Sequence, residues 1–439
     1  MPLDYPIHRR TLPNGLRVVV SPDHTVPNVT VNLWVGVGSR HEAPGRTGFA
    51  HLFEHLMFQG SRGVRSGEHF EALMAEGGRL NATTWFDRTN YFETVPTGAV
   101  ELALWLEADR HGHLLDAVTQ ENLDNQRDVV KEEKRQRYDN QPYGTALIDV
   151  YATVFPEGHP YHHPTIGSME DLDAASLEDV HAFFRAHYGP DNTVLTLCGD
   201  ITPEEGFALV ERYFAELAAS AEPRRPDHSL LEPISEPLRL ERVETVPNDR
   251  LHIAFRLPVD ETDEFTAAAV ALDCIGGLAT SRLVRRLVRR EQTALAAHAT
   301  AWGFVDGASL GFVVLDVAPG SDSAAVEAAF VEELAGFLDD GPTDVELEAS
   351  LAQSERSWLS ALASQEERAD LLSHHLLLHD DPNIVNTHLD RLRAVTAEQA
   401  RDAARRWLRP ESRAVVAYLS AEDAVDGHVG ADATAGAPA

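Results

Sequence analysis

Two histidines and a glutamate lie within a short apolar stretch, GFAHLFEHLMFQG, at residues 48–60. His51 and His55 are four residues apart, so on an α-helix both imidazoles lie on one face, about one turn apart. Two imidazole nitrogens at this spacing can bind one metal ion at about 2.0 to 2.1 Å. Glu54 is adjacent to His55 but offset around the helix, so its carboxylate can reach a water on the metal rather than the metal itself.

The alternative is a helix whose polar face happens to carry two histidines. Large apolar residues surround them, however, and burying titratable groups among such residues is costly unless they line a site. The order H-x-x-E-H is also a signature of zinc peptidases. We therefore interpret His51 and His55 as zinc ligands and Glu54 as a general base. A catalytic zinc site needs a third protein ligand and one open position.

The third ligand is expected on a second helix, NQRDVVKEEKRQRYD, at residues 125–139. Val129 and Val130 mark its apolar stripe, and Glu133 follows three or four residues later on the same side. Glu132 points about 100° away from Glu133, so an undistorted helix cannot present both to one ion. The two glutamates alone are typical of a solvated charge run. Their combination with the histidine motif favours Glu133, with Glu132 as the alternative.

These helices belong to a chain that contains an internal repeat. VPNVTVNLWVGV from Val26 and VPNDRLHIAFRL from Val246 each indicate a turn followed by an alternating strand. HAFFRAHYGPDNTVLTL and RDAARRWLRPESRAVVA each indicate an amphipathic helix, a proline turn and a strand, with Pro190 matching Pro410. Both pairs have the same offset of 220 residues. The sequence therefore predicts two homologous halves of roughly 220 residues.

The predicted fold class is α+β. Each half is expected to form an antiparallel-rich sheet with helices packed on one face, and the halves are expected to enclose a chamber on dimerisation. The predicted boundaries are an N-terminal domain at 1–220, a Pro-, Ser- and charge-rich linker at 221–236, and a C-terminal domain at 237–423. Residues 424–439 lack apolar periodicity, which predicts a disordered tail.

Chain length and net charge limit the classes of partner that the protein is expected to bind. A chain of 439 residues is too long to fold around one ordinary hydrophobic core, which predicts more than one domain. Its formal net charge of −33 opposes binding to nucleic acid and to anionic membrane surfaces, and it favours basic or neutral peptides. An acidic surface that serves only solubility is the alternative. The sequence shows no apolar segment of signal-peptide or transmembrane length, so a cytoplasmic location is expected.

Cysteines and the other histidines give no second site. Cys198 and Cys274 lie in apolar segments and are predicted to be buried thiols rather than a disulfide. The remaining histidines are expected to be surface groups or satisfied core groups; they include His111, His113, His162, His163, His374 and His375.

The sequence resembles the M16 metallopeptidases, the family of pitrilysin, insulinase and mitochondrial processing peptidase, in its single-chain, two-half bacterial type. The resemblance covers nearly the whole chain. It rests on LPNGLRVVV, GSRHEAPGRTGFAHLFEHLMFQGS, GGRLNATTWFDRTNYF, QRDVVKEEKRQRYDNQPYG, GHPYHHPTIGSMEDL and YGPDNTVLTLCGDI. It implies Zn²⁺, endopeptidase chemistry, and a chamber too small for folded proteins.

Carried over residue by residue, the resemblance assigns the metal site. His51 and His55 match the histidine ligands, Glu54 matches the general base, and Glu133 matches the third ligand. Gln126 stands where the family has a glutamate, so one charge near the metal is replaced by a neutral amide.

The resemblance also assigns residues that bind substrate. GRLNATT, at residues 78–84, matches an edge strand on which the peptide substrate adds as a further strand. Asn81 and Ala82 would be its central contacts. In the second half, Arg290 matches an arginine that binds the substrate backbone, whereas Ala297 stands where the family has a tyrosine.

The implied function is a zinc-dependent endopeptidase that cleaves peptides or unfolded segments, possible substrates being leader peptides and propeptides. Family members of this kind act as homodimers, or as heterodimers in which one subunit holds zinc and the other holds the arginine and tyrosine. Because of Ala297, we expect this chain to be the zinc-bearing subunit of an M16 heterodimer. A homodimer in which His298 or another residue replaces the tyrosine, and a non-catalytic peptide-binding or scaffold subunit, are the alternatives.

Overall fold

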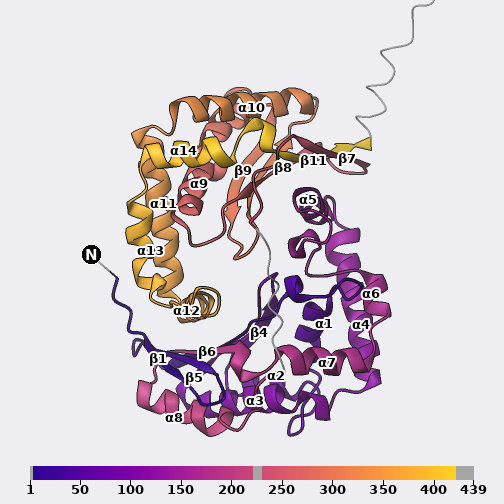
Figure 1. Ribbon diagram of the computed structural model, residues 1–439, viewed down its shortest axis with the longest axis vertical. Helices are drawn as coiled ribbons and strands as arrows, with labels where there is room; N and C mark the ends of the chain where they lie inside the picture. Colours follow the sequence, from indigo (N-terminus) through magenta and orange to yellow (C-terminus); the bar gives the residue numbers. More distant parts are fainter. Residues whose placement is uncertain (1–2, 221–229, 422–439) are drawn as a thin grey trace, which may run out of the picture. The chain divides into compact units, whose positions relative to one another are not determined.

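The computed structural model describes residues 3–220 and 230–421. The chain forms two compact units, each built around one β-sheet (Figure 1). The first unit contains Met1–Lys134, His163–Asp227 and Ser354–Asp390, and the second contains Arg135–His162, His228–Gln353 and Arg391–Ala439. The predicted tail and residues 221–229 of the predicted linker lie outside the described residues.

The sheet of the first unit has six strands in the order β1-β2-β6-β3-β5-β4. All neighbouring strands are antiparallel except β2 and β6, which are parallel. The strands are β1 (His8–Thr11), β2 (Arg17–Pro22), β3 (Asn28–Val35), β4 (Arg79–Thr84), β5 (Thr89–Pro96) and β6 (Thr193–Gly199). The helices of this unit are α1 (Phe49–Leu56), α2 (Glu68–Ala75), α3 (Val100–His113), α4 (Gln120–Lys134), α6 (Met169–Asp173), α7 (Leu177–His187), α8 (Pro203–Phe214) and α12 (Gln365–His379), while α13 (Ile384–Arg393) has residues in both units.

Both faces of this sheet are covered, which explains why its central strands are almost wholly buried. Val31 and Leu33 of β3 point to one face, where they share a core with residues of α3 and α8. Trp34 of β3 and Val194 of β6 point to the other face, where they pack with Leu372 of α12. Alternate residues of a strand point to opposite faces, so each of these strands contributes to two cores.

The sheet of the second unit has five strands in the order β7-β11-β8-β10-β9. Its pairs are antiparallel except β7 and β11. The strands are β7 (Leu238–Glu244), β8 (Arg250–Leu257), β9 (Ala294–Trp302), β10 (Ser309–Val317) and β11 (Ala414–Ser420). Helix α5 packs against β7, β8 and β11, and α14 packs against both α9 and α10. These helices are α5 (Ala146–Val154), α9 (Asp263–Leu272), α10 (Ser323–Asp340) and α14 (Ala397–Trp407), and α11 (Asp344–Ala363) has residues in both units.

The structure confirms the α+β, two-half prediction. Helices α7 and α14 begin 220 residues apart, at Leu177 and Ala397, and each is followed by a proline turn and a central strand. Each helix also begins with a capping box, in which Ser176 or Thr396 exchanges hydrogen bonds with the third helical residue. The internal repeat therefore includes the capping residues at the N-terminal ends of these two helices.

Two segments pack in the unit that belongs to the other half of the sequence. Helix α5 comes from the first half but packs on the sheet of the second unit, and α12 comes from the second half but covers the first sheet. Helices were predicted on only one face of each sheet. In the first unit this prediction is incomplete, because α12 covers the other face of the sheet. The predicted domains 1–220 and 237–423 correspond to the two copies of the repeat. The compact units differ from these domains, because each unit includes one of these two segments from the other half of the sequence.

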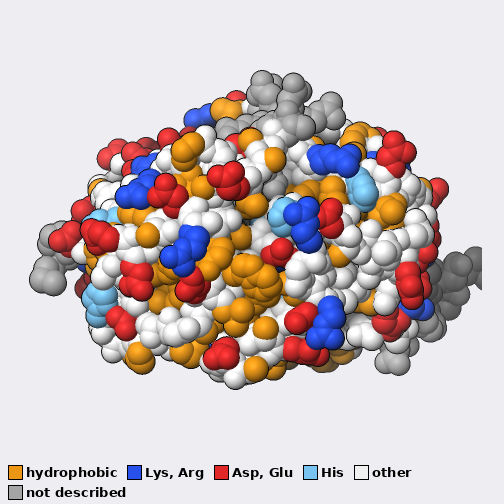
Figure 2. All heavy atoms as spheres, turned by 90° about the horizontal axis from the view of Figure 1, so that it is seen from below, with side chains coloured by type: hydrophobic (Ala, Val, Ile, Leu, Met, Phe, Trp, Pro, Cys, Tyr) orange, Lys and Arg blue, Asp and Glu red, His pale blue; other side chains and the backbone are white. Residues whose placement is uncertain are grey.

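The surface is mixed in charge. The face drawn in Figure 2 carries Asp and Glu side chains interspersed with Lys, Arg and hydrophobic side chains. Cys198 and Cys274 are both buried free thiols, as predicted. Within residues 3–220 and 230–421, no helix combines the length and apolar character that crossing a bilayer requires.

Candidate metal centre

Helix α1 carries the H-x-x-E-H motif, and a buried carboxylate holds its first turn. Gly48 precedes the helix with a φ of 89°, a backbone conformation that favours glycine. Glu42 accepts hydrogen bonds from the backbone N–H groups of Gly48 at 2.9 Å and Ala50 at 2.8 Å. A carboxylate at this position satisfies donors that the helix leaves unpaired and lies favourably in the helix dipole. Burial raises the pKa of Glu42 well above its usual range, against the effect of these two donors.

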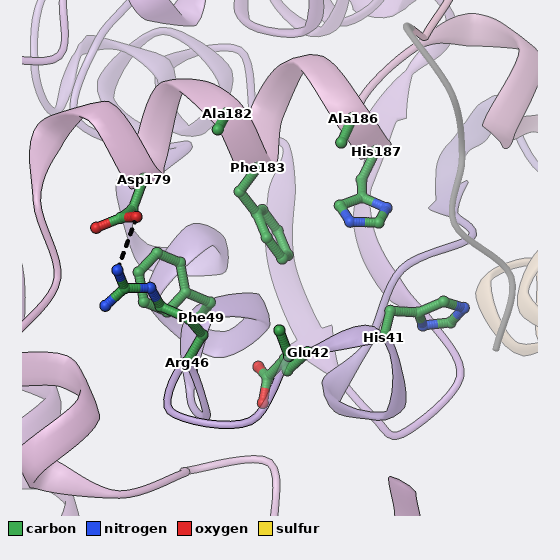
Figure 3. Close-up of a pocket in the computed structure, with 10 residues that line it drawn as sticks. His41, Glu42, Arg46, Phe49, Asp179, Ala182, Phe183, Ala186 and His187 are labelled. Atoms are coloured by element: carbon green, nitrogen blue, oxygen red, sulfur yellow. Dashed lines mark ion pairs between the residues drawn. The ribbon is translucent and has the colours of Figure 1, made fainter.

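A cavity of about 560 Å³ lies beside the loop before α1 (Figure 3). Phe183 and His187 of α7 line one side of it, and Phe49 and Glu42 line the other. The ion pair between Arg46 and an aspartate of α7, Asp179, is 3.1 Å long and links this loop to α7. The loop that starts the motif helix is therefore fixed at both ends.

The apolar side of α1 packs against α7. Leu52, Phe53 and Leu56 are fully buried. The ring centroid of Phe53 lies 5.0 Å from that of Phe183 and 5.1 Å from that of Tyr188. Because these residues fix one side of the helix, the orientation of the opposite side, which carries the two histidines, is fixed as well.

The two histidines and Glu133 converge on one point. The Oε2 atom of Glu133 lies 3.6 Å from His51 Nε2 and 3.4 Å from His55 Nε2. Their donor atoms form a group that could hold a metal ion. Three donors bound tetrahedrally to Zn²⁺ at about 2.0 to 2.2 Å lie about 3.3 to 3.6 Å apart. The two distances from Glu133 to the imidazole nitrogens lie in or near this range, so the donor set fits Zn²⁺.

Helix α4 presents Glu133 rather than Glu132 to the histidines. Glu133 is partly buried, whereas Glu132 is exposed on the turn beside it. Val130 and Gln126 are buried on the packed side of the helix. The Arg127 guanidinium donates hydrogen bonds of 2.7 and 2.8 Å to two backbone carbonyls, that of Leu172 in α6 and that of Ala175 just after it. Packing and these hydrogen bonds set the rotation of α4, and that rotation directs Glu133 inward.

Glu54 lies beside this centre and is bound by a residue that sequence reasoning missed. Thr84 Oγ1 donates a hydrogen bond of 2.5 Å to Glu54 Oε2. Burial raises the pKa of Glu54, while the Thr84 hydrogen bond and the nearby His55 oppose the rise. Thr84 is the last residue of β4, so one hydrogen bond connects the motif helix to the predicted substrate strand. The only sequence signal was its place in GRLNATT.

Strand β4 carries the predicted substrate contacts. Among the described strands it pairs only with β5, so it forms an edge of the sheet. Asn81 is exposed, and its Oδ1 accepts a hydrogen bond of 2.9 Å from the N–H of Ala82, which is 7% exposed. An edge strand offers backbone donors and acceptors to an added peptide strand.

Behind β4 lies a chain of polar contacts that sequence reasoning also missed. Arg88 donates a hydrogen bond of 2.9 Å to the carbonyl of Thr83, and its guanidinium lies 4.7 Å from the ring centroid of Trp34. Asp370 of α12 accepts hydrogen bonds from Trp34 Nε1 at 2.8 Å and Asn90 Nδ2 at 3.1 Å. Helix α12 is thereby connected through β3 and β5 to the edge strand.

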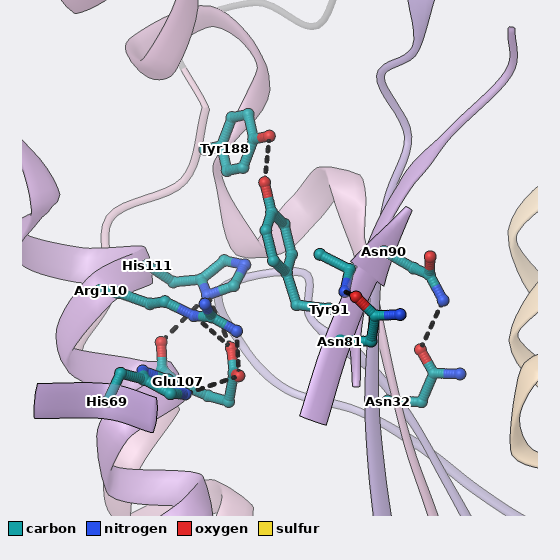
Figure 4. A network of polar contacts seen from close by, with 10 residues as sticks. Asn32, His69, Asn81, Asn90, Tyr91, Glu107, Arg110, His111 and Tyr188 are labelled. Carbon is teal, nitrogen blue, oxygen red and sulfur yellow. Dashed lines mark hydrogen bonds and ion pairs between the residues drawn. The ribbon is translucent and has the colours of Figure 1, made fainter. Parts of the chain in front are cut away.

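A second buried polar network supports β5 from the side of α3 (Figure 4). Arg110 binds Glu107 through two hydrogen bonds, one of them 2.9 Å long. Burial alone would raise the pKa of Glu107, but the Arg110 charge lowers it to about 2. Burial lowers the pKa of His69 to about 3. The donor atoms of His69, Glu93 and Glu107 are close enough for a metal ion, but Arg110 already neutralises Glu107, so we interpret this network as structural.

The remaining predicted substrate residue lies in the second unit. The Arg290 side chain is 68% exposed, and its Nη2 lies 3.4 Å from Oε1 of Glu291. Ala297 is partly buried on β9, and its neighbour His298 is exposed. The structure thus collects His51, His55, Glu54, Glu133, Asn81 and Ala82 in the first unit and leaves Arg290 in the second.

Fold and site together define a two-half α+β protein whose H-x-x-E-H helix carries a candidate metal centre. The family described as "Insulinase (Peptidase family M16)" matches residues 17–166. The domain described as "Peptidase M16 inactive domain" matches residues 174–354. The chain belongs to peptidase family M16.

The alignments with individual relatives cover most of the chain. The zinc protease PqqE of Helicobacter pylori is 29% identical over 379 residues, covering 84% of this chain and 83% of the relative. An uncharacterised zinc protease of Mycobacterium leprae is 30% identical over 369 residues, covering 82% of each. The crystal structure of a protease from Helicobacter pylori superposes with a TM-score of 0.87 at 24% identity, covering 94% of this chain and 99% of that one. That structural likeness supports the fold.

Proposed function

We propose that this chain is a zinc-dependent endopeptidase. The observation that carries the proposal is the convergence of His51 and His55 on Glu133, whose Oε2 lies 3.6 and 3.4 Å from the two imidazole nitrogens, with Glu54 held beside them. The zinc proteases among its relatives support this function.

In this proposal, His51, His55 and Glu133 hold Zn²⁺, which when bound supplies a Lewis acid for the scissile carbonyl and lowers the pKa of water. Glu54 takes the proton of the attacking water and delivers it to the leaving amine. Burial raises the pKa of Glu54, which strengthens it as a base. Thr84 holds the carboxylate in place through its 2.5 Å hydrogen bond.

The proposed substrates are peptides or unfolded segments, such as leader peptides or propeptides. An extended peptide would add to the exposed edge of β4 through main-chain hydrogen bonds, with Asn81 and Ala82 as central contacts. Main-chain recognition tolerates many side chains but requires an unfolded segment. The net charge of −33 favours basic or neutral peptides. We assign Arg290 to the substrate backbone, and a cytoplasmic location stays a prediction.

We further propose that the chain is the zinc-bearing subunit of an M16 heterodimer, because alanine occupies position 297, where the resemblance expects tyrosine. The alternative is a self-sufficient homodimer. Assay of the purified chain alone on a peptide library distinguishes them. Robust turnover without a partner chain would contradict the heterodimer, and no turnover until a second M16 chain is added would support it.

The catalytic proposal is tested by separating metal binding from hydrolysis. Glu54→Gln should keep the zinc ion of this centre and lose peptide cleavage, whereas His55→Ala should lose both the zinc ion of this centre and cleavage. Glu71→Gln, which changes an exposed glutamate of α2, is the matched control and should change neither. Cleavage by Glu54→Gln at the wild-type rate would remove Glu54 from the base role. A wild-type chain that binds no zinc would favour the non-catalytic scaffold function.

A further inference from the structure

Three further histidines gather near the C-terminal end of α12. One ring nitrogen from each of His374, His375 and His379 lies within 4.8 Å of the other two, a spacing that allows the three to hold a metal ion. From the sequence alone, His374 and His375 are expected to be surface groups or satisfied core groups. His375 and His379 are four residues apart on one helix, the same spacing as His51 and His55, so one turn presents both imidazoles on one side.

The ring geometry fits a shared ion. The ring centroid of His374 lies 4.9 Å from that of His375 and 5.5 Å from that of His379, and the His375 and His379 centroids are 6.0 Å apart. Imidazoles bound tetrahedrally to one ion at about 2.0 to 2.1 Å have their centroids about 5 Å apart. In the candidate zinc centre the corresponding centroids of His51 and His55 are 4.9 Å apart. Modest side-chain rotations would therefore bring the second set to coordination distance.

The helix that carries this set is held firmly. Ser373 Oγ lies 2.8 Å from Thr196 Oγ1 of β6, and Asp370 binds Trp34 on β3. The His374 ring meets the Trp34 ring edge-on, with centroids 5.5 Å apart. His375 is 3% exposed. A ligand set on a fixed helix loses less side-chain freedom when a metal binds.

The local electrostatics favour a cation. α12 ends at His379, and the cap residue Asp380 has a left-handed backbone conformation. The C-terminal end of a helix carries partial negative charge and attracts cations. The net charge of the chain is −33. The helix end therefore favours a cation, and Arg17 already donates a hydrogen bond of 3.2 Å to the carbonyl of Leu376 in its last turn.

We propose that His374, His375 and His379 form a second metal site, which binds a late first-row divalent ion such as Zn²⁺ or Cu²⁺. Three imidazoles suit these ions better than Mg²⁺ or Ca²⁺, which prefer oxygen ligands. This site shares no residue with the candidate zinc centre, and its existence does not depend on the proposed peptidase function.

The test is metal stoichiometry of the full chain, measured by equilibrium dialysis against Zn²⁺ followed by elemental analysis. Wild type should bind two Zn²⁺ ions per chain. The double variant H374A/H379A and the double variant H51A/H55A should each bind one, and the quadruple variant should bind none. His8→Ala, which removes an exposed histidine of β1, should bind two. Buried His375 is left unchanged so that the core beside it is preserved.

Two further measurements distinguish lost ligands from lost folding. H374Q/H379Q keeps side-chain volume at both positions and should also bind one ion, with circular dichroism like that of wild type. H51A/H55A loaded with Cu²⁺ should show electron paramagnetic resonance of nitrogen-ligated copper, and this signal should be lost when H374Q/H379Q is added to the same chain. A wild-type stoichiometry of one Zn²⁺, or folded H374Q/H379Q that still binds two, would overturn the proposal.

Discussion

Replacing Thr84 with valine removes one hydroxyl and tests whether the substrate strand positions the catalytic base. The hydroxyl donates a 2.5 Å hydrogen bond to Glu54 Oε2. A hydrogen bond to a charged group contributes about 1.5 to 3 kcal/mol, and Glu54 is shielded from water by burial. Because each 1.4 kcal/mol changes a rate tenfold, kcat/KM should fall by about 10- to 150-fold.

The pH profile gives a second measure of the same contact. Burial raises the pKa of Glu54, and the Thr84 hydrogen bond lowers it. Without that bond the pKa rises further, so the carboxylate is protonated at a higher pH. The acidic limb of kcat/KM should therefore move to higher pH in Thr84→Val, because a general base acts only when deprotonated.

The assay is cleavage of a fluorogenic peptide by the active assembly, with zinc content measured on the same samples. Thr84→Ser keeps the hydroxyl and should recover most of the lost activity. Thr84→Val with full zinc and wild-type kcat/KM would refute the role of Thr84. Loss of zinc in Thr84→Val would point instead to a structural effect on α1.

Three further outcomes follow from the buried polar groups. Arg88→Met removes the hydrogen bond to a carbonyl of β4 and should raise KM more than it lowers kcat; unchanged KM would contradict this. Arg110→Met leaves Glu107 buried without its partner and should lower the free energy of unfolding by about 3 to 5 kcal/mol in urea titrations; a loss below about 1 kcal/mol would show that Glu107 finds another partner. Burial lowers the pKa of His69 to about 3 and that of His111 to about 4. Both pKa values lie below the unfolded value of about 6.5, so the unfolded state takes up protons first as the pH falls. The free energy of unfolding should therefore be constant above pH 6.5 and decrease toward pH 4 by up to about 1.4 kcal/mol per pH unit for each histidine. Urea unfolding at pH 7 and pH 5 measures this decrease. Equal stability at the two pH values would contradict this reasoning.

The sequence predicted the parts of the site that depend on local helix geometry. His51 and His55 share a face because four residues make about one turn. The choice of Glu133 over Glu132 rested on an apolar stripe of Val129 and Val130. Val130 is buried as expected, but Val129 is 41% exposed, and the structure places Glu133 beside both imidazoles. Short-range periodicity is sufficient for such inferences, because an amphipathic helix buries its stripe and thereby fixes its other side.

The residues that sequence reasoning missed depend on long-range packing. Thr84 reaches Glu54 only because β4 lies against α1. Arg88 and Asp370 are 282 positions apart in the sequence, but both contact Trp34. No periodicity within a single segment relates such residues. The same limit applies to His374, His375 and His379, whose convergence depends on side-chain directions rather than on spacing alone.

Because α12 comes from the second half of the sequence but covers the first sheet, the two halves depend on each other for folding. Trp34 and Val194 present an apolar face that α12 covers, and Asp370 of the same helix supports the strands beside β4. A fragment that ended at residue 220 would contain every predicted zinc ligand, but it would lack this helix. Its first sheet would expose that face to water, which is costly because apolar burial is the main stabilising contribution to folding. The unit that holds the candidate zinc centre therefore depends on sequence from the second half, and the repeat folds as one interdependent chain.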